Sequence, residues 1–514
     1  MAQSTSALRR HLGLPDVIAQ SVSVIAPAMS GAFLTYLAAT KAGGATPLAY
    51  VLASLGAFAI GGVVAEFAKT MSSAGSLYTY TATGLTKTAG FVLGWLYSLA
   101  FIILAGAVLA GFGFFTSLLL QSVFDTSTFI PWWIFFVGGL VFAAGMSMFN
   151  VRISTRTQLI LTAVSVAAMV VTAIWVIFDG SPEGTEQAGK SIDMAAFWPP
   201  AADIPWSGIL LGFAFGLLSF TGFEAGAVLA EETEKPKHNI PRAIIGSVAF
   251  AGVFYVLITY ATSIGFGVKE AKVAWPASVA GLVAVSPSKN LGNLVLLAAA
   301  ISSLLCGLGV STAASRFLFA MGREGVLPRA LGKTNPKWHT PWTAIIFNVI
   351  LMAVLIWGLL AVLPTSTQVA LTGVDADGNP IWPTSMRGGL AAFSYWATLA
   401  TPAVMFCYLL LGLAGVRKGS RDGNRRLTIA GVLATLTGIL AVIGSLYYSF
   451  KEVAPGAGIL FVFKIIPWVV LAAILVGIAI ASYLRSKKPV AWADMGQVFD
   501  EAELEQAESA MPIV

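Results

Sequence analysis

A long apolar stretch near the start of the chain contains APAMSGAF, residues 26–33. Pro27 removes a backbone donor and clashes with the preceding turn, and Gly31 permits unusual torsions, so a helix through this segment should break. The surrounding sequence, residues 16–40, is long and apolar enough to cross a bilayer. Because backbone in hydrocarbon must be hydrogen-bonded, an interrupted helix survives there only where it lines a cavity or packs inside protein.

A second interruption occurs in the apolar segment 206–230, at SFTGFE, residues 219–224. If the first five and the next five spans are repeats, the two breaks occupy corresponding positions, which is typical of a transporter's midplane binding site. Free N–H groups at a half-helix N-terminus attract a carboxylate, and free carbonyls accept from an ammonium group, so such a site would read both ends of an α-amino acid. The alternative is a pair of ordinary kinks, since Gly and Pro are common in membrane helices.

The composition indicates a membrane protein that crosses the bilayer many times. Of 514 residues, 57% are hydrophobic and 11% are charged, against about 25% charged in soluble domains. Two cysteines exclude a disulfide scaffold. Three scattered histidines, with no metal-ligand spacing, nucleophile elbow or phosphate-binding loop, predict no enzyme activity, no metal site and no cofactor.

The apolar runs predict an all-α fold with twelve transmembrane helices and no cleavable signal peptide, because the first run is too long for one. The predicted spans are 16–40, 47–70, 89–120, 131–149, 156–178, 206–230, 242–267, 292–320, 342–364, 389–415, 427–449 and 460–484.

The distribution of basic residues predicts the orientation. With the N-terminus inside, 22 of the 30 Lys and Arg residues fall on the cytoplasmic side and eight on the other. This bias predicts that both termini are cytoplasmic. It also accounts for the net charge of +6 without a nucleic-acid partner.

Four segments, in order, resemble the amino acid–polyamine–organocation (APC) permeases, and the resemblance covers about residues 14–484. The matching segments are SGAF at 30–33, AGSLYTY at 74–80 with GFVLGW at 90–95, GFE at 222–224 with EETEKPKHNIPRA at 231–243, and SR at 315–316 with REGVLP at 323–328.

The resemblance implies a five-plus-five inverted repeat with broken helices 1 and 6, two additional helices, and alternating access around a site between helices 1, 3, 6, 8 and 10. The implied organisation is a cytoplasmic N-terminus (1–15), a first repeat (16–178), an extracellular loop (179–205), a second repeat (206–415), helices 11 and 12 (416–484) and a cytoplasmic tail (485–514).

Carried over by position, the resemblance predicts which residues hold the substrate. Ser30 and Gly31 would offer N–H groups to a carboxylate, carbonyls of both breaks would face the ammonium group, and Phe101 would line the side-chain pocket. The expected substrate-binding residues are Pro27, Ala28, Met29, Ser30, Gly31, Phe101, Leu218, Ser219, Phe220, Thr221 and Gly222.

The chain departs from the family pattern at three positions that concern gating and coupling. Met29 replaces a glycine, the helix-6 aromatic gate falls at Leu218, so that Phe215 or Phe220 would gate instead, and Ser165 stands where proton-coupled members carry lysine. Phe223 is a further candidate for gating or coupling. Glu224, the next residue, would be a proton carrier, a gate latch, or a structural ligand of the broken backbone.

The coupling ion would be H⁺ or Na⁺. A sodium site would draw on the carbonyls of Ile25 and Ala28, with Ser165 opposite and with Ser302 and Cys306 on helix 8, although cysteine is a poor ligand for a hard cation.

The sequence therefore predicts a secondary transporter of amino acids in the plasma membrane. A neutral substrate is favoured, because a charged side chain would need a buried partner. Polyamine transport, a non-transporting amino acid sensor and an ion channel are the alternatives. The expected partners are a small amino acid or amine and membrane lipid, and the sequence does not set an oligomeric state.

Overall fold

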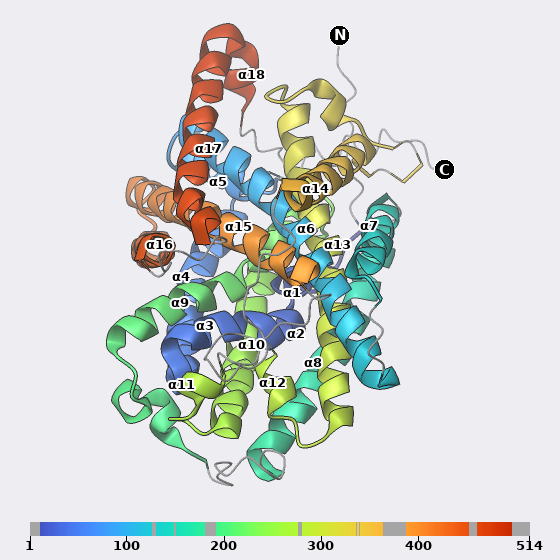
Figure 1. Ribbon diagram of the computed structural model, residues 1–514. Coiled ribbons are helices and arrows are strands. Elements are labelled where there is room, and N and C mark those ends of the chain that lie inside the picture. Colours follow the sequence, from blue (N-terminus) through green and yellow to red (C-terminus); the bar gives the residue numbers. More distant parts are fainter. Residues whose placement is uncertain are drawn as a thin grey trace.

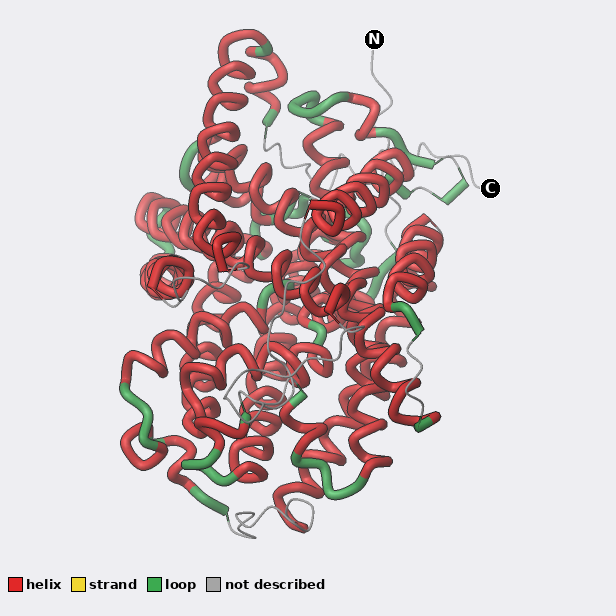
Figure 2. Tube along the Cα trace, in the orientation of Figure 1, coloured by secondary structure: helices red, strands yellow, loops and turns green. Residues whose placement is uncertain are grey.

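The computed structural model describes residues 11–73, 75–125, 130–148, 151–179, 192–275, 280–335, 337–338, 340–362, 387–451 and 460–495. Within these ranges the chain is helical and forms no strand (Figure 2). A single backbone bridge pairs Leu12 with Thr233. The sequence-based assignments for residues 1–10, 363–386 and 496–514, and for residues 180–191 of the predicted outer loop, lie outside the described residues.

The first half of the chain forms ten helical elements. They are α1 (Leu14–Ile25), α2 (Pro27–Met29), the π-helical η1 (Ser30–Leu34), α3 (Thr35–Ala42), η2 (Gly43–Ala45), α4 (Thr46–Ala68), α5 (Leu77–Gly84), α6 (Lys87–Phe124), α7 (Trp132–Met148) and α8 (Val151–Asp179).

The rest of the described chain begins with short 3₁₀ turns and contains six helices of more than 20 residues. Its elements are η3 (Met194–Phe197), η4 (Pro199–Ala202), α9 (Trp206–Phe220), η5 (Phe223–Leu229), α10 (Pro236–Phe266), α11 (Ala271–Ala274), α12 (Gly281–Ala284), α13 (Lys289–Arg323), η6 (Arg329–Gly332), α14 (Trp342–Val362), α15 (Arg387–Arg421), α16 (Arg425–Lys451), α17 (Leu460–Lys487) and α18 (Pro489–Asp494).

The described helices fit a membrane-spanning bundle. Nine runs among them are long and apolar enough to cross a bilayer, and one of these, Leu14–Ala68, contains the first two predicted spans. Trp132–Met148 and Trp342–Leu355 are shorter apolar helices at the fourth and ninth predicted spans. The all-helical membrane fold is therefore confirmed, whereas twelve complete crossings and the repeat stay predictions.

The centre of the molecule is built from α6, which packs against both α13 and α15, while α4 packs against α10. The short helix α18 lies at one end of the molecule, and α11 and α12 lie at the other (Figure 1). Lipid tails are as apolar as the side chains they would replace, so close van der Waals contact, made possible by small residues, drives helix association in a bilayer.

Glycines bring α15 and α16 into backbone contact. A Cβ added at Gly431 of α16 would lie 2.5 Å from the amide nitrogen of Val416, and one at Gly438 would lie 2.9 Å from the Cα of Leu409. Since the opposing atoms are backbone, no side-chain rotation can relieve such a contact, and the helices would have to separate.

We predict that Gly431→Ala lowers the stability of the purified protein by about 1–3 kcal/mol, the usual cost of overpacking a well-packed site. The measurement is the thermal unfolding midpoint in detergent. Gly145→Ala on α7 is the matched control, because its added methyl meets no atom within 4 Å. Equal midpoints for the two variants would contradict this account of the α15–α16 contact.

Candidate functional site

The first interruption lies at Ala26, between α1 and α2. Ala26 adopts a left-handed conformation (φ 50°), and the first hydrogen bond after it runs from the Ser30 amide to the Ala26 carbonyl, 2.8 Å. The N–H groups of Ala28 and Met29 precede that bond and therefore face the break without intrahelical acceptors. The break thus falls at the first residue of the predicted segment 26–33, and the Ser30 N–H is engaged by Ala26.

The second interruption separates α9 from the 3₁₀ turn η5. The Thr221 amide closes α9 on the Leu218 carbonyl at 3.0 Å, and Gly222 follows with φ 106°. A Cβ at Gly222 would lie 2.1 Å from Cγ1 of Val24, so the two breaks touch. Glycine is required here both by its torsion and by this approach.

Two tyrosines that the sequence analysis did not single out bind the interrupted helix ends. The Tyr255 hydroxyl on α10 lies within donor distance of the carbonyls of Ile25 (3.1 Å) and Ser219 (2.9 Å). The Tyr50 hydroxyl on α4 pairs with the Ser219 hydroxyl at 2.7 Å. Carbonyls at the ends of α1 and α9, the half-helices that precede the two breaks, lack helical donors and are thus satisfied by tyrosines embedded in apolar runs.

A small cavity of about 20 Å³ lies where the two breaks meet. It is enclosed by the helices that the resemblance implied, namely α1 with α2 and η1, α6, α9, α13 and α15. Its lining residues are Val24, Ile25, Met29, Ser30, Leu34, Leu104, Val108, Leu218, Thr221, Cys306, Phe393 and Ala397. This volume suffices for about one water molecule, so the helices are closed around the site in this conformation.

The structure brings part of the predicted substrate-binding set to the cavity. Met29, Ser30, Leu218 and Thr221 line it. The other predicted residues lie outside the lining and are Pro27, Ala28, Gly31, Phe101, Ser219, Phe220 and Gly222. Leu104, Val108, Phe393 and Ala397 were missed, because apolar residues of buried helices carry no sequence signal that distinguishes a pocket from ordinary packing.

The predicted aromatic residues make specific contacts beside the cavity. Phe101 is stacked on Tyr97, with ring centroids 4.2 Å apart, one turn of α6 before the lining residue Leu104. Phe220 meets the Tyr255 ring edge-on at 5.2 Å, and Phe223 stacks on Tyr408 at 6.1 Å. Phe215 is buried on α9. In this conformation the gate assigned to Phe215 or Phe220 does not line the cavity.

Glu224 lies on η5, directly after the second break, and joins η5 to α6 and α15. Its Oε1 accepts hydrogen bonds from the hydroxyl of Tyr97 on α6 and from that of Tyr408 on α15, the latter at 2.7 Å. Its Oε2 accepts from the Gly222 amide at 3.1 Å. Glu224 thus binds the broken backbone, and it also ties η5 to two other helices.

The residues considered for sodium bind other protein groups here. The Ile25 carbonyl accepts from the Ser30 hydroxyl at 3.0 Å and lies near that of Tyr255. The Ser165 hydroxyl donates to Leu161 on its own helix, and Cys306 donates to the Val24 carbonyl. Ser302 and Ala28 are buried. Ile25 and Cys306 line the cavity, whereas Ala28, Ser165 and Ser302 do not.

Ion pairs close the end of the molecule that is predicted to be cytoplasmic. Arg316 on α13 binds Glu232 at 2.7 Å, and both side chains are almost fully buried. Arg323 holds Glu231 through two hydrogen bonds of 2.8 and 2.9 Å. The Leu12 amide also donates to the Glu232 carbonyl at 3.0 Å, so the N-terminal segment joins this closure.

Interrupted helices that meet at an enclosed cavity within an apolar bundle define a membrane transport protein. A family model described as "Amino acid permease" matches residues 12–495. The chain belongs to this family, whose members are transporters rather than enzymes.

Similar proteins differ in their substrates. The chain is 26% identical to the low-affinity putrescine importer PlaP of Escherichia coli (strain K12), over 65% of this chain and 72% of the importer. It is 26% identical to the branched-chain amino acid permease BcaP of Bacillus subtilis (strain 168), over 66% and 72%. It is also 26% identical to the chloroplastic cationic amino acid transporter 7 of Arabidopsis thaliana, over 69% and 61%.

We predict that Gly222→Ala lowers uptake into proteoliposomes by at least about fivefold. The added methyl must push Val24 away from the second break, and overpacking of about 1–3 kcal/mol at the site corresponds to such a change. Gly246→Ala on α10, whose methyl would meet no atom within 4 Å, is the control. Uptake by the Gly222 variant equal to that of the control would refute the role given to this contact.

Proposed function

We propose that the protein is a secondary active transporter of neutral, apolar amino acids that works by alternating access. The proposed architecture has twelve crossings, a five-plus-five inverted repeat, a plasma-membrane location and cytoplasmic termini. Membership of the amino acid permease family supports transport, and the bias of basic residues supports the orientation.

The observation that carries the choice of substrate is the chemistry of the cavity lining. None of the lining residues is charged, and the polar ones are Ser30, Thr221 and Cys306. The N–H groups of Ala28 and Met29 precede the first hydrogen bond of the half-helix that begins at Pro27, and such groups attract a carboxylate. Carbonyls at the ends of α1 and α9 would accept from an ammonium group. Leu34, Leu104 and Val108 then suit an aliphatic side chain.

Polyamine transport is the second candidate, because PlaP is a putrescine importer. A dication in a low-dielectric site needs an anionic partner. The carboxylate nearest to the breaks in sequence is that of Glu224, which does not line the cavity and already accepts from Tyr97, Tyr408 and Gly222. This arrangement favours a neutral amino acid.

The closed cavity implies that the helices part during transport. At the predicted cytoplasmic end, opening would separate α13 from the segment that carries Glu231 and Glu232. Buried ion pairs strongly favour the closed arrangement, because separating the two partners would leave each charge uncompensated. At the other end, opening would separate Phe33 on η1 from Phe393 on α15, whose rings are 4.7 Å apart.

Of the two coupling ions, the contacts favour H⁺. All three groups around Glu224 donate to it, which suits an ionised carboxylate. Protonation would turn one acceptor oxygen into a donor and so reverse or break at least one of the hydrogen bonds that link η5 to its neighbours. For sodium coupling, the Ile25 carbonyl would have to release the hydroxyls of Ser30 and Tyr255 before it could bind the cation.

The test of the substrate is uptake by purified protein in liposomes. We predict saturable uptake of radiolabelled leucine, isoleucine or valine, with competition by other apolar amino acids and none by putrescine. The Gly222→Ala variant serves as the transport-deficient control.

Other outcomes identify the alternatives. Saturable putrescine uptake that leucine does not inhibit would replace the proposal with polyamine transport. A flux that rises linearly with concentration would indicate a channel. Ligand-induced thermal stabilisation without any flux would indicate a sensor.

For coupling, we predict that Glu224→Gln abolishes the stimulation of uptake by an inwardly directed pH gradient while exchange of internal for external substrate continues. The amide oxygen can still accept from the tyrosines, but its NH₂ group opposes the Gly222 N–H and mimics the protonated state. Uptake is compared with and without the gradient, in sodium and in choline buffers. Gradient-driven uptake by the variant, or strict dependence on sodium, would contradict proton coupling through Glu224.

A further inference from the structure

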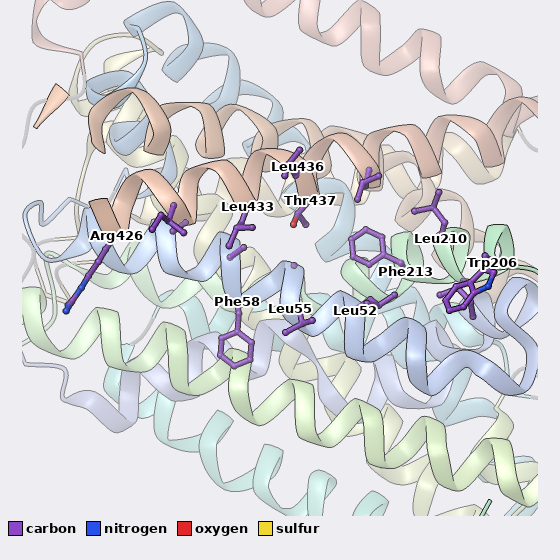
Figure 3. Close-up of a pocket in the computed structure, with 16 residues that line it drawn as sticks. Leu52, Leu55, Phe58, Trp206, Leu210, Phe213, Arg426, Leu433, Leu436 and Thr437 are labelled. Carbon is purple, nitrogen blue, oxygen red and sulfur yellow. The ribbon is translucent and has the colours of Figure 1, made fainter. Parts of the chain in front are cut away.

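A large apolar groove lies on the outside of the bundle and shares no lining residue with the substrate cavity. It has a volume of about 980 Å³ and runs between α4, α9 and α16. The labelled side chains extend from Arg426 at one end, past Leu433 and Thr437, to Trp206 at the other (Figure 3). Arg426 is the only charged residue of the lining.

The groove is hollowed by small residues. Gly56 and Ala59 of α4 face Ala430 and Thr437 of α16, and a Cβ at Gly56 would lie 2.7 Å from the Thr437 methyl. Larger apolar residues form the sides, and several of them are substantially exposed, including Leu55 (62%). Such a surface is suited to a long apolar ligand.

The length of the groove suits one lipid entering from the Arg426 end. Along α16, the lining runs from Arg426 to Leu440, about 21 Å at 1.5 Å per residue. One leaflet contributes about 15 Å to a hydrocarbon core of about 30 Å. An acyl chain anchored near Arg426 therefore has apolar contacts over its whole depth.

The charge at that end selects the headgroup. Arg425 and Arg426 occupy the first turn of α16, where the helix dipole already favours anions. Among the described residues Arg426 forms no ion pair, while Glu66, the carboxylate that attracts it, is bound by Lys69 and by Asn424. Exposed Arg426 can thus meet a phosphate at the membrane surface, which the charge bias predicts to be the cytoplasmic one.

We propose that this groove is a specific binding site for one anionic glycerophospholipid of the leaflet at the Arg426 end. Its phosphate is bound by Arg426 and its acyl chains lie against α4, α9 and α16. The bound lipid contacts the outer face of α9, the helix whose other end contributes Leu218 to the substrate cavity.

The test is native mass spectrometry of the full-length protein released from nanodiscs that contain equal amounts of phosphatidylglycerol and phosphatidylcholine. One phosphatidylglycerol should remain bound. Arg426→Gln should weaken its retention about fivefold, the effect of one basic residue at a lipid surface. Arg425→Gln, a change in the adjacent exposed arginine that does not line the groove, should leave it unchanged.

A second pair of variants tests the apolar part of the site. Leu433→Trp places a bulky side chain in the groove and should remove the bound lipid, whereas Leu475→Trp on α17, at a similarly exposed position (57% against 51%), should not. Unfolding midpoints show whether each variant is folded, and the comparison uses pairs with equal midpoints. Three outcomes would each overturn the proposal. In the first, the protein retains both lipids equally, and in the second, Arg426→Gln leaves the retention of phosphatidylglycerol unchanged. The third outcome is that Leu433→Trp removes a dimer mass and not a lipid mass.

Discussion

The structure depends on one requirement: every peptide N–H and C=O inside a bilayer needs a partner, because no water is available there. Continuous helices meet it automatically, whereas the breaks at Ala26 and Gly222 do not. Side chains from elsewhere compensate for the missing bonds. The Tyr255 hydroxyl lies between carbonyls at the ends of α1 and α9, and Glu224 accepts a hydrogen bond from the Gly222 amide. Polar residues are therefore concentrated around the breaks.

Close packing converts these local repairs into a single site. Gly222 lies against Val24, so each break fixes the position of the other, and the lining helices close over a space of about one water molecule. Around this space the side chains are mainly apolar. The backbone groups at the breaks and the surrounding aliphatic side chains thus provide the two kinds of contact that a neutral amino acid requires.

Charge is used differently at the ends of the bundle and on its outer face. Arg316 and Glu232 are buried together, where each is needed to compensate the other. Arg426, in contrast, is exposed beside an apolar groove and forms no ion pair among the described residues. The first arrangement stabilises a closed conformation, and the second leaves a cation available to the membrane.

The sequence by itself determined the membrane class, the position of nearly every helix, the family and the two segments where helices break, because hydropathy, proline and glycine act locally. Only the tertiary structure decided that the first break lies at Ala26, that Leu104, Val108 and Phe393 line the cavity instead of Phe101, and that Tyr97, Tyr255 and Tyr408 hold the breaks. These features depend on the rotation of one helix against another, and residues far apart in the chain leave no local pattern that records it.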